Sequence, residues 1–278
     1  MSKVSFFDRR VLKLYSVYIS VIASIFTIVL AFFTLDSNQK STYGLIFLGA
    51  SIVIYIWIWF RANDLKSIEV DIEGTKVIVK EGDIFNEDGL KAIAFNEYFD
   101  TLVDDKIVAK RTLNGLFINK FFLESTASLD QFIEDYFQND DVEVNENPAR
   151  KSGKTKKYDA GTICVYEDFL LTAFAKFDEQ NRAILTMPEY IEFLIKFWDQ
   201  VNRVYAQKSV AVPIFGSGIT RIKEHKNIQD EDLLKIMLWT FRISEMRFKH
   251  PAKLTIVIHK DKIDTINLFE IKHSNNGL

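Results

Sequence analysis

The segment SVAVPIFGSGITR (Ser209–Arg221) places a short apolar run directly before two closely spaced glycines. The apolar run predicts a buried strand, and Pro213, Gly216 and Gly218 leave the backbone that follows uncovered by large side chains. Successive backbone N–H groups of such a loop can converge on an anion, and Arg221 would add positive charge. A tight turn needs the same small residues, so the segment predicts either a phosphate-binding loop or an ordinary turn.

A second segment, VKEGDIF (Val79–Phe85), ends another apolar strand in Gly82-Asp83-Ile84. A carboxylate just past a strand end can accept a hydrogen bond from an adenine amino group, and apolar neighbours such as Ile84 would shield that contact. The alternative is that Asp83 caps a turn.

The rest of the chain after residue 66 alternates predicted strands and helices. Two β-type runs flank the turn at Glu73-Gly74, and later strands are expected in GLKAIAF, GTICVY, FLLTAFAKF, SVAVPIF and KLTIVIH. Helices are expected in SLDQFIEDYFQ with Ser128 as N-cap, in the segment that starts at Met187-Pro188, in DEDLLKIMLWTFRISEMRF, and in a short closing DTINLFEIK. This alternation predicts an α/β domain with a mixed sheet between helices.

Two long apolar stretches, Val11–Phe33 and Thr42–Phe60, precede this domain. Each is long enough to cross the hydrocarbon core as a helix, and the short polar linker Leu35–Ser41 makes the two spans an antiparallel hairpin. A cleaved signal peptide is the alternative for the first stretch, but a second span follows at once and no small-residue cleavage site is evident. We therefore predict a tail and two transmembrane helices in residues 1–66 and a cytoplasmic domain in residues 67–278.

Basic residues gather on one side of the predicted hairpin, at Lys3, Arg9, Arg10, Lys13, Arg61 and Lys66. Positive residues favour the cytoplasmic side, so both termini are expected in the cytoplasm and the chain in the cell membrane. Small residues recur every four positions, at Ser16, Ser20 and Ser24 and at Ala23, Thr27 and Ala31. They permit close helix packing in lipid, although such residues are also common in spans generally.

The composition argues against several other classes of protein. A net charge of −3 shows no basic excess, so a general nucleic-acid binder is not expected. Cys164 is the only cysteine and the four histidines are scattered, so neither a disulfide nor a metal site is predicted, and no cofactor is expected. The SGKT at Ser152–Thr155 is similar to the end of a P-loop, but Pro148 stands where that motif needs its first glycine. Residues 138–161, acidic and then basic, predict a flexible surface insertion.

Gly82-Asp83-Ile84 followed later by Pro213-x-x-Gly216-x-Gly218 resembles the macro domain, a three-layer α/β/α module that binds ADP-ribose. The resemblance covers roughly Ile68 to the C-terminus. It implies that Asp83 and Ile84 contact adenine, that Asn96 lies near the distal ribose, and that the diphosphate is wrapped by Gly216, Ser217, Gly218 and Ile219.

The chain departs from the hydrolytic members of that family at one place. Those members carry N-A-A-N after the next strand, whereas this chain reads AFNEYFD (Ala94–Asp100). The small residues and the second asparagine are missing, so the resemblance favours binding over hydrolysis, and no catalytic residue is expected.

Two spans before such a domain resemble the membrane effectors of Thoeris anti-phage systems, the ThsA proteins with an N-terminal membrane hairpin. The segments Ala94–Asp105 and Leu113–Phe122 carry this resemblance. It implies that a TIR-domain partner makes a modified ADP-ribose from NAD. The effector would bind this signal, form a homo-oligomer and damage the lipid bilayer, which kills the infected cell.

Two other functions stay open on the sequence. One is a membrane-anchored ADP-ribosyl hydrolase or NAD-consuming enzyme, with Asn96, Glu97 and Asp100 as the local polar candidates near the scissile bond. The other is a tethered scaffold or sensor that binds no nucleotide.

Overall fold

The computed structural model describes residues 2–34, 36–139, 142, 144–178, 180–223, 225, 227–249 and 251–274, with only the backbone at Arg221. The chain divides into two compact units. One comprises Met1–Lys66 with Ile266–Ser274, and the other spans Ser67–Thr265.

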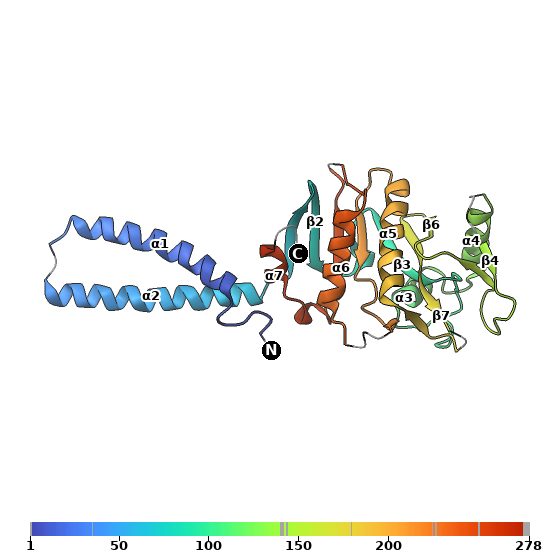
Figure 1. Cartoon of the computed structure of the whole chain (residues 1–278), viewed down its shortest axis with the longest axis horizontal. Helices are drawn as coiled ribbons and strands as arrows, with labels where there is room; N and C mark the ends of the chain where they lie inside the picture. The colour runs from blue at the N-terminus through green and yellow to red at the C-terminus, as the bar shows by residue number, and fades with distance from the viewer. Residues whose placement is uncertain are drawn as a thin grey trace. The chain divides into compact units, whose positions relative to one another are not determined.

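The first unit contains a helical hairpin made of α1 (Arg9–Ala31) and α2 (Ser37–Asn63) (Figure 1). The two helices are antiparallel, because Phe26 stacks on Phe47 and Tyr15 meets Tyr55 edge to face. Both helices are long and apolar enough to cross a membrane. α2 begins before the predicted span because the Gln39 side chain accepts the N–H of Asp36 at 3.1 Å and starts the helix inside the polar linker.

The short helix α7 (Leu268–His273) packs with the hairpin in this unit. Phe269 is buried in one apolar cluster with Val11 of α1 and Ile58 of α2. The Arg10 guanidinium lies 3.5 Å from the Glu270 carboxylate. The predicted closing helix is confirmed, and the structure adds that it contributes to the core at the base of the hairpin.

The second unit is built on one mixed sheet. Within the described residues it has nine strands in the order β1-β2-β11-β9-β3-β7-β8-β10, with β6 paired to β7. Their bounds are β1 Ser67–Ile72, β2 Thr75–Glu81, β3 Leu90–Asn96, β6 Ile163–Tyr166, β7 Phe169–Phe177, β8 Ala183–Leu185, β9 Val210–Pro213, β10 Arg221–Ile222 and β11 Leu254–Ile258. The neighbours β2, β11, β9, β3 and β7 run parallel, so their carboxyl ends share one edge.

Helices cover both faces of this sheet. They are α3 (Leu113–Phe121), α4 (Ala127–Asn139), α5 (Met187–Val204) and α6 (Asp230–Ile243), with 3₁₀ turns η1 (Ile84–Asn86) and η2 (Ile263–Thr265). Along β7, Leu171 and Ala173 pack into the cluster of α3 and α4. Phe174, on the opposite side of the strand, contacts Phe193 of α5. The predicted α/β/α architecture with a mixed sheet is therefore confirmed (Figure 1).

Several local features differ from the predictions; the helix predicted to run to Phe248, for example, ends at Ile243. Ser128 lies inside α4 and does not cap it, because the helix already starts at Ala127 and the Thr126 hydroxyl bonds the Asp130 carboxylate instead. Helix α3 was not predicted at all.

The predicted insertion contains a small antiparallel hairpin, β4 (Val144–Glu146) and β5 (Lys156–Tyr158). Residues 140, 141 and 143 of it lie outside the described residues. Its flexibility stays a prediction.

Candidate nucleotide-binding site

A cavity of about 500 Å³ opens at the carboxyl edge of the parallel strands; we call it the glycine-loop cavity. Its wall is formed by the end of β3, the end of β7, the start of α3, the loop Pro213–Thr220 after β9, and Lys262. Ligands of α/β proteins commonly bind at this edge, where loops from several strands meet. The fold therefore gathers segments that are far apart in sequence around one hollow.

The two glycines of the loop have different roles. Gly216 has a φ of 85°, in the left-handed region that glycine adopts without strain. Gly218 has no atom within 4 Å of the place where a Cβ would stand, so its backbone borders open space. Just before them, the Phe215 carbonyl accepts a hydrogen bond of 2.9 Å from the buried Tyr190 hydroxyl. One end of the loop is thus anchored in the core while the other is open to the cavity.

The amino terminus of α3 forms a second polar wall. Thr112 caps this helix by accepting the Gly115 N–H at 3.3 Å, and Arg111, Thr112 and Asn114 all line the cavity. The positive end of a helix and an arginine both favour an anion. Lys262 adds a second cation, which pairs with Asp230 at 3.0 Å. No carboxylate lines the cavity within the described part of the chain.

Asn96, at the end of β3, is held by a tight polar turn. Its Oδ1 accepts the backbone N–H groups of Tyr98 at 3.0 Å and Asp100 at 3.2 Å. Its Nδ2 donates to the Asp100 carboxylate at 2.8 Å. Asn96 is buried yet lines the cavity, so its position is fixed before any ligand arrives.

Comparisons with known proteins bear on this arrangement. The family model "Thoeris protein ThsA, Macro domain" matches residues 77–259. A Thoeris protein ThsA from Bacillus amyloliquefaciens (strain Y2) is 39% identical over 269 residues, covering 95% of this chain and 89% of that protein. The chain belongs to the ThsA family.

Membership of the ThsA family places the chain among Thoeris proteins of antiviral defence, with a macro domain, as the resemblance implied. Solved macrodomains of Oceanobacillus iheyensis are also similar. A point mutant of that macrodomain is 12% identical, with a TM-score of 0.49 over 75% of this chain and 97% of that one. The same macrodomain with ADP is 11% identical, with a TM-score of 0.47 over 74% of this chain and 95% of that one.

In this ThsA-family chain most of the predicted ligand residues come together. The glycine-loop cavity is lined by Asn96, Pro213, Gly216, Ser217, Gly218 and Ile219. Asp83 and Ile84 lie outside this lining: Asp83 accepts the Phe85 N–H at 3.0 Å and starts η1, while Ile84 packs in the core. Their contact with adenine stays a prediction, and the side chain of Arg221 lies outside the described residues.

The two carboxylates named for a hydrolase are used within the fold of this ThsA-family chain. Glu97 accepts the Phe177 N–H and pairs with Lys157, each at 3.2 Å. Asp100 pairs with Arg150 at 2.7 Å. Neither lines the glycine-loop cavity. Over the described ranges, no group of three His, Cys, Asp or Glu side chains is placed to hold a metal ion.

Sequence reasoning missed the α3 wall and a second cavity in this ThsA-family chain. The signal for the wall was Thr112, a residue type that commonly caps helices, but no long apolar period follows it. The second cavity, of about 900 Å³, adjoins the first through shared lining residues such as Ile107 and Phe177. Its rim is ordered by Asp104, whose pKa is lowered by hydrogen bonds from the backbone N–H groups of Ile107 and Lys106.

Proposed function

We propose that this chain is the membrane effector of a Thoeris anti-phage system and that its macro domain binds a modified ADP-ribose signal made by a TIR-domain partner. The observation that carries the proposal is the meeting of the Gly216–Gly218 loop and the α3 amino terminus around one cavity. Backbone N–H groups and a helix terminus are suited to a diphosphate. The cavity volume falls in the range of about 300–1,000 Å³ that small-molecule sites occupy.

The apolar helices support a membrane location. Large side chains on both helices are exposed in the hairpin, among them Val17, Ile25 and Ile28 of α1 and Leu45 and Ile52 of α2. Exposed apolar surface on this scale marks contact with lipid or with other protein. The basic residues at the base of the hairpin, before α1 and at the end of α2, support cytoplasmic termini, because positive residues favour the inner face.

Binding has to change the state of the protein for the hairpin to act. A ligand shifts an equilibrium only by its differential affinity for the two states. In our proposal the signal binds the assembling state more tightly, the chains form a homo-oligomer, and the clustered hairpins disrupt the bilayer. Small residues of α1 such as Ala23 and Thr27 would permit close helix approach in that assembly.

The test uses full-length protein in detergent. ADP-ribose and the products of a TIR-domain enzyme acting on NAD are titrated by calorimetry, and particle mass is followed by light scattering. We expect binding and a rise in mass with the native chain, and loss of both in Gly218→Glu. Absence of binding to every one of these nucleotides would overturn the proposal, and steady turnover of NAD by the purified chain would instead support an enzyme.

A further inference from the structure

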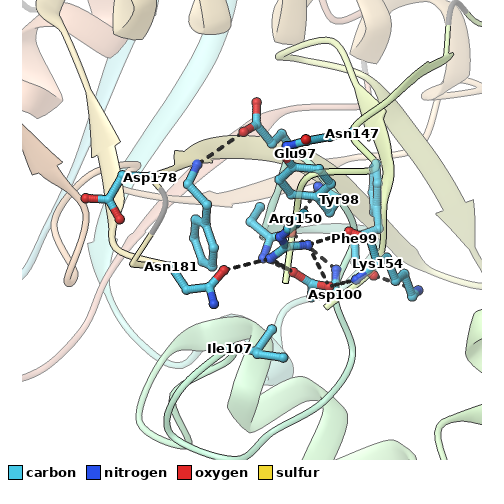
Figure 2. Close-up of polar contacts among 12 residues, drawn as sticks. Glu97, Tyr98, Phe99, Asp100, Ile107, Asn147, Arg150, Lys154, Asp178 and Asn181 are labelled. Carbon is cyan, nitrogen blue, oxygen red and sulfur yellow. Dashed lines mark hydrogen bonds and ion pairs between the residues drawn. The ribbon is translucent and has the colours of Figure 1, made fainter. Parts of the chain in front are cut away.

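Arg150, in the β4–β5 hairpin, makes a buried ion pair with a carboxylate fifty positions earlier (Figure 2). Its Nη2 lies 2.7 Å from Asp100 Oδ2 and its Nη1 lies 3.2 Å from Asp100 Oδ1. The two side chains are only 7% and 2% exposed. The guanidinium also stacks on the Tyr98 ring, 3.8 Å from its centroid. The predicted surface insertion therefore sends one side chain into the interior of the domain.

The same carboxylate connects Arg150 to the glycine-loop cavity. Asp100 accepts two further hydrogen bonds of 2.8 Å, one from Asn96 Nδ2 and one from the backbone N–H of Lys154. Asn96 lines the cavity and its Oδ1 holds the turn that follows β3. A continuous set of hydrogen bonds thus runs from the hairpin through Arg150 and Asp100 to the cavity wall.

The turn that these contacts hold is strained. Phe99 is fully buried and has a φ of 49°, a conformation that bulky residues rarely adopt. Such a conformation persists only where the surroundings over-determine it. Here the surroundings are Asn96 from one side and the Arg150–Asp100 pair from the other, with Lys154 Nζ donating to the Phe99 carbonyl at 2.8 Å.

Arg150 also contacts the wall of the second cavity. Its Nη2 donates to Asn181 Oδ1 at 3.1 Å (Figure 2). Asn181 lines that cavity together with Gly153. Arg150 is therefore connected to both cavities, to one through Asp100 and Asn96 and to the other through Asn181. A planar guanidinium that binds a carboxylate with both arms fixes geometry in a way that a lysine cannot.

We infer that Arg150 is a positioning residue for nucleotide binding: it holds the turn Asn96–Asp100 in the shape that the ligand requires. The inference rests on the proposed function. It assigns the β4–β5 hairpin a role in ligand affinity, although the hairpin lies far in sequence from the glycine loop. A buried ion pair contributes less to stability than apolar packing of the same volume does. The position of the Arg150–Asp100 pair beside a cavity therefore points to a role in geometry.

The experiment compares full-length Arg150→Gln, Arg150→Lys and Asp100→Asn/Arg150→Gln with the native chain in detergent. The first readout is hydrogen exchange of the Tyr98 and Asp100 amides without ligand, and the second is calorimetric affinity for ADP-ribose. We expect faster exchange and an affinity loss of about tenfold or more in Arg150→Gln, because the Asp100 charge is left buried and unpaired. Arg150→Lys should be intermediate, and the double variant should recover part of the loss.

Met246→Ala is the control, because it opens a cavity at a buried site outside the lining of both hollows and destabilises without touching the turn. If Arg150→Gln does not fold, Gly153→Ala replaces it. Gly153 has a φ of 90°, and a Cβ there would lie 2.7 Å from both Arg150 Nη1 and Asp100 Oδ1. That substitution displaces the pair but keeps both charges.

Unchanged exchange at Tyr98 and Asp100, or native affinity in Arg150→Gln, would overturn the inference. An effect of the same size in Met246→Ala would do so too, because it would reduce the role of Arg150 to general stability. A native chain that binds neither ADP-ribose nor the products of a TIR-domain enzyme acting on NAD would contradict the proposed function instead, while the exchange readout would still decide whether Arg150 holds the turn.

Discussion

The hydroxyl of Tyr190 donates a hydrogen bond of 2.9 Å to the carbonyl of Phe215, and both residues are buried. Tyr190 belongs to α5, and Phe215 directly precedes the Gly216–Gly218 loop. Burial raises the pKa of Tyr190, so its hydroxyl remains a donor at physiological pH. The hydrogen bond from α5 therefore fixes the start of a loop whose glycines leave its backbone conformationally free.

Replacement of Tyr190 by phenylalanine should loosen this loop. Tyr190→Phe leaves the Phe215 carbonyl buried without a partner, which costs about 1–3 kcal/mol of unfolding free energy. We also expect weaker binding of ADP-ribose, because the free loop has to be ordered when the ligand binds. Thermal unfolding and calorimetry measure the two effects. Tyr205→Phe, at a ring that contacts Phe248, is the matched control and should leave affinity unchanged.

The two glycines of the loop should respond differently to substitution. Gly216→Ala places a side chain at a φ of 85°, which costs about 1–2 kcal/mol in stability. Gly218→Ala meets open space and should fold and bind like the native chain, whereas Gly218→Glu sets a negative charge against the expected diphosphate. We expect Gly218→Glu to lose nucleotide binding at native thermal stability. Equal affinities of Gly218→Ala and Gly218→Glu in calorimetry would contradict a phosphate at this loop.

Local patterns in the sequence predicted the elements that carry strong periodicity or a clear start. The helix α5 is an example: Pro188 stands in its first turn, and Thr186 with Glu189 forms a capping box. The glycine loop was predicted for the same reason, since its small residues directly follow an apolar run. Asn96 was recognised through the family resemblance and lies on the cavity wall.

The parts of the site that escaped prediction depend on contacts between distant segments. The sequence predicts Arg150 to be a solvent-exposed charge in a polar insertion. No neighbouring residue indicates that it pairs with Asp100. The α3 wall depends on the direction in which a short helix points, which the tertiary fold decides. Asp83 accepts the Phe85 N–H in a local turn, as one of the two alternatives for this residue predicted, and its contact with adenine stays a prediction.

Acid should weaken the α5 cap through Glu189. Burial opposes ionisation of this carboxyl, but hydrogen bonds from Lys176 and Thr186 outweigh it and lower the pKa of Glu189 from 4.5 to about 2. A lowered pKa in the folded state adds stability above the unfolded value of 4.5, and this stability is lost as the pH falls toward 2.

Glu189→Gln should therefore lower the melting temperature at pH 7, and the difference from the native chain should shrink as the pH falls from 4.5 toward 2. Glu192→Gln, on the exposed side of α5, removes a carboxylate from the same helix and is the control. A difference that stays constant with pH would contradict the role of the Glu189 charge.

The single cysteine should be unreactive in the folded protein. Cys164 is fully buried in β6, and burial raises its pKa to about 12, so almost no thiolate is present at neutral pH. We expect no labelling by maleimide of the native chain at pH 7 and complete labelling in denaturant, as read by mass spectrometry. Rapid labelling without denaturant would show that β6 opens in the native state.

Because Cys164 is expected not to react with maleimide, the native chain is a suitable background for testing the membrane topology. Lys40 lies in the first turns of α2, next to the link between the two helices, and Lys3 lies before α1. The test uses cells in which a membrane-impermeant maleimide reaches the outer face of the intact cell membrane. If both termini are cytoplasmic, the reagent should label Lys40→Cys in these cells and should label Lys3→Cys only after permeabilisation. The reason is the positive-inside rule: most basic residues near the hairpin lie at its base, whereas its tip carries Lys40 beside Asp36. The reverse labelling pattern would invert the proposed orientation, and the same result at both sites in intact cells, labelled or unlabelled, would show that α1 does not span the membrane.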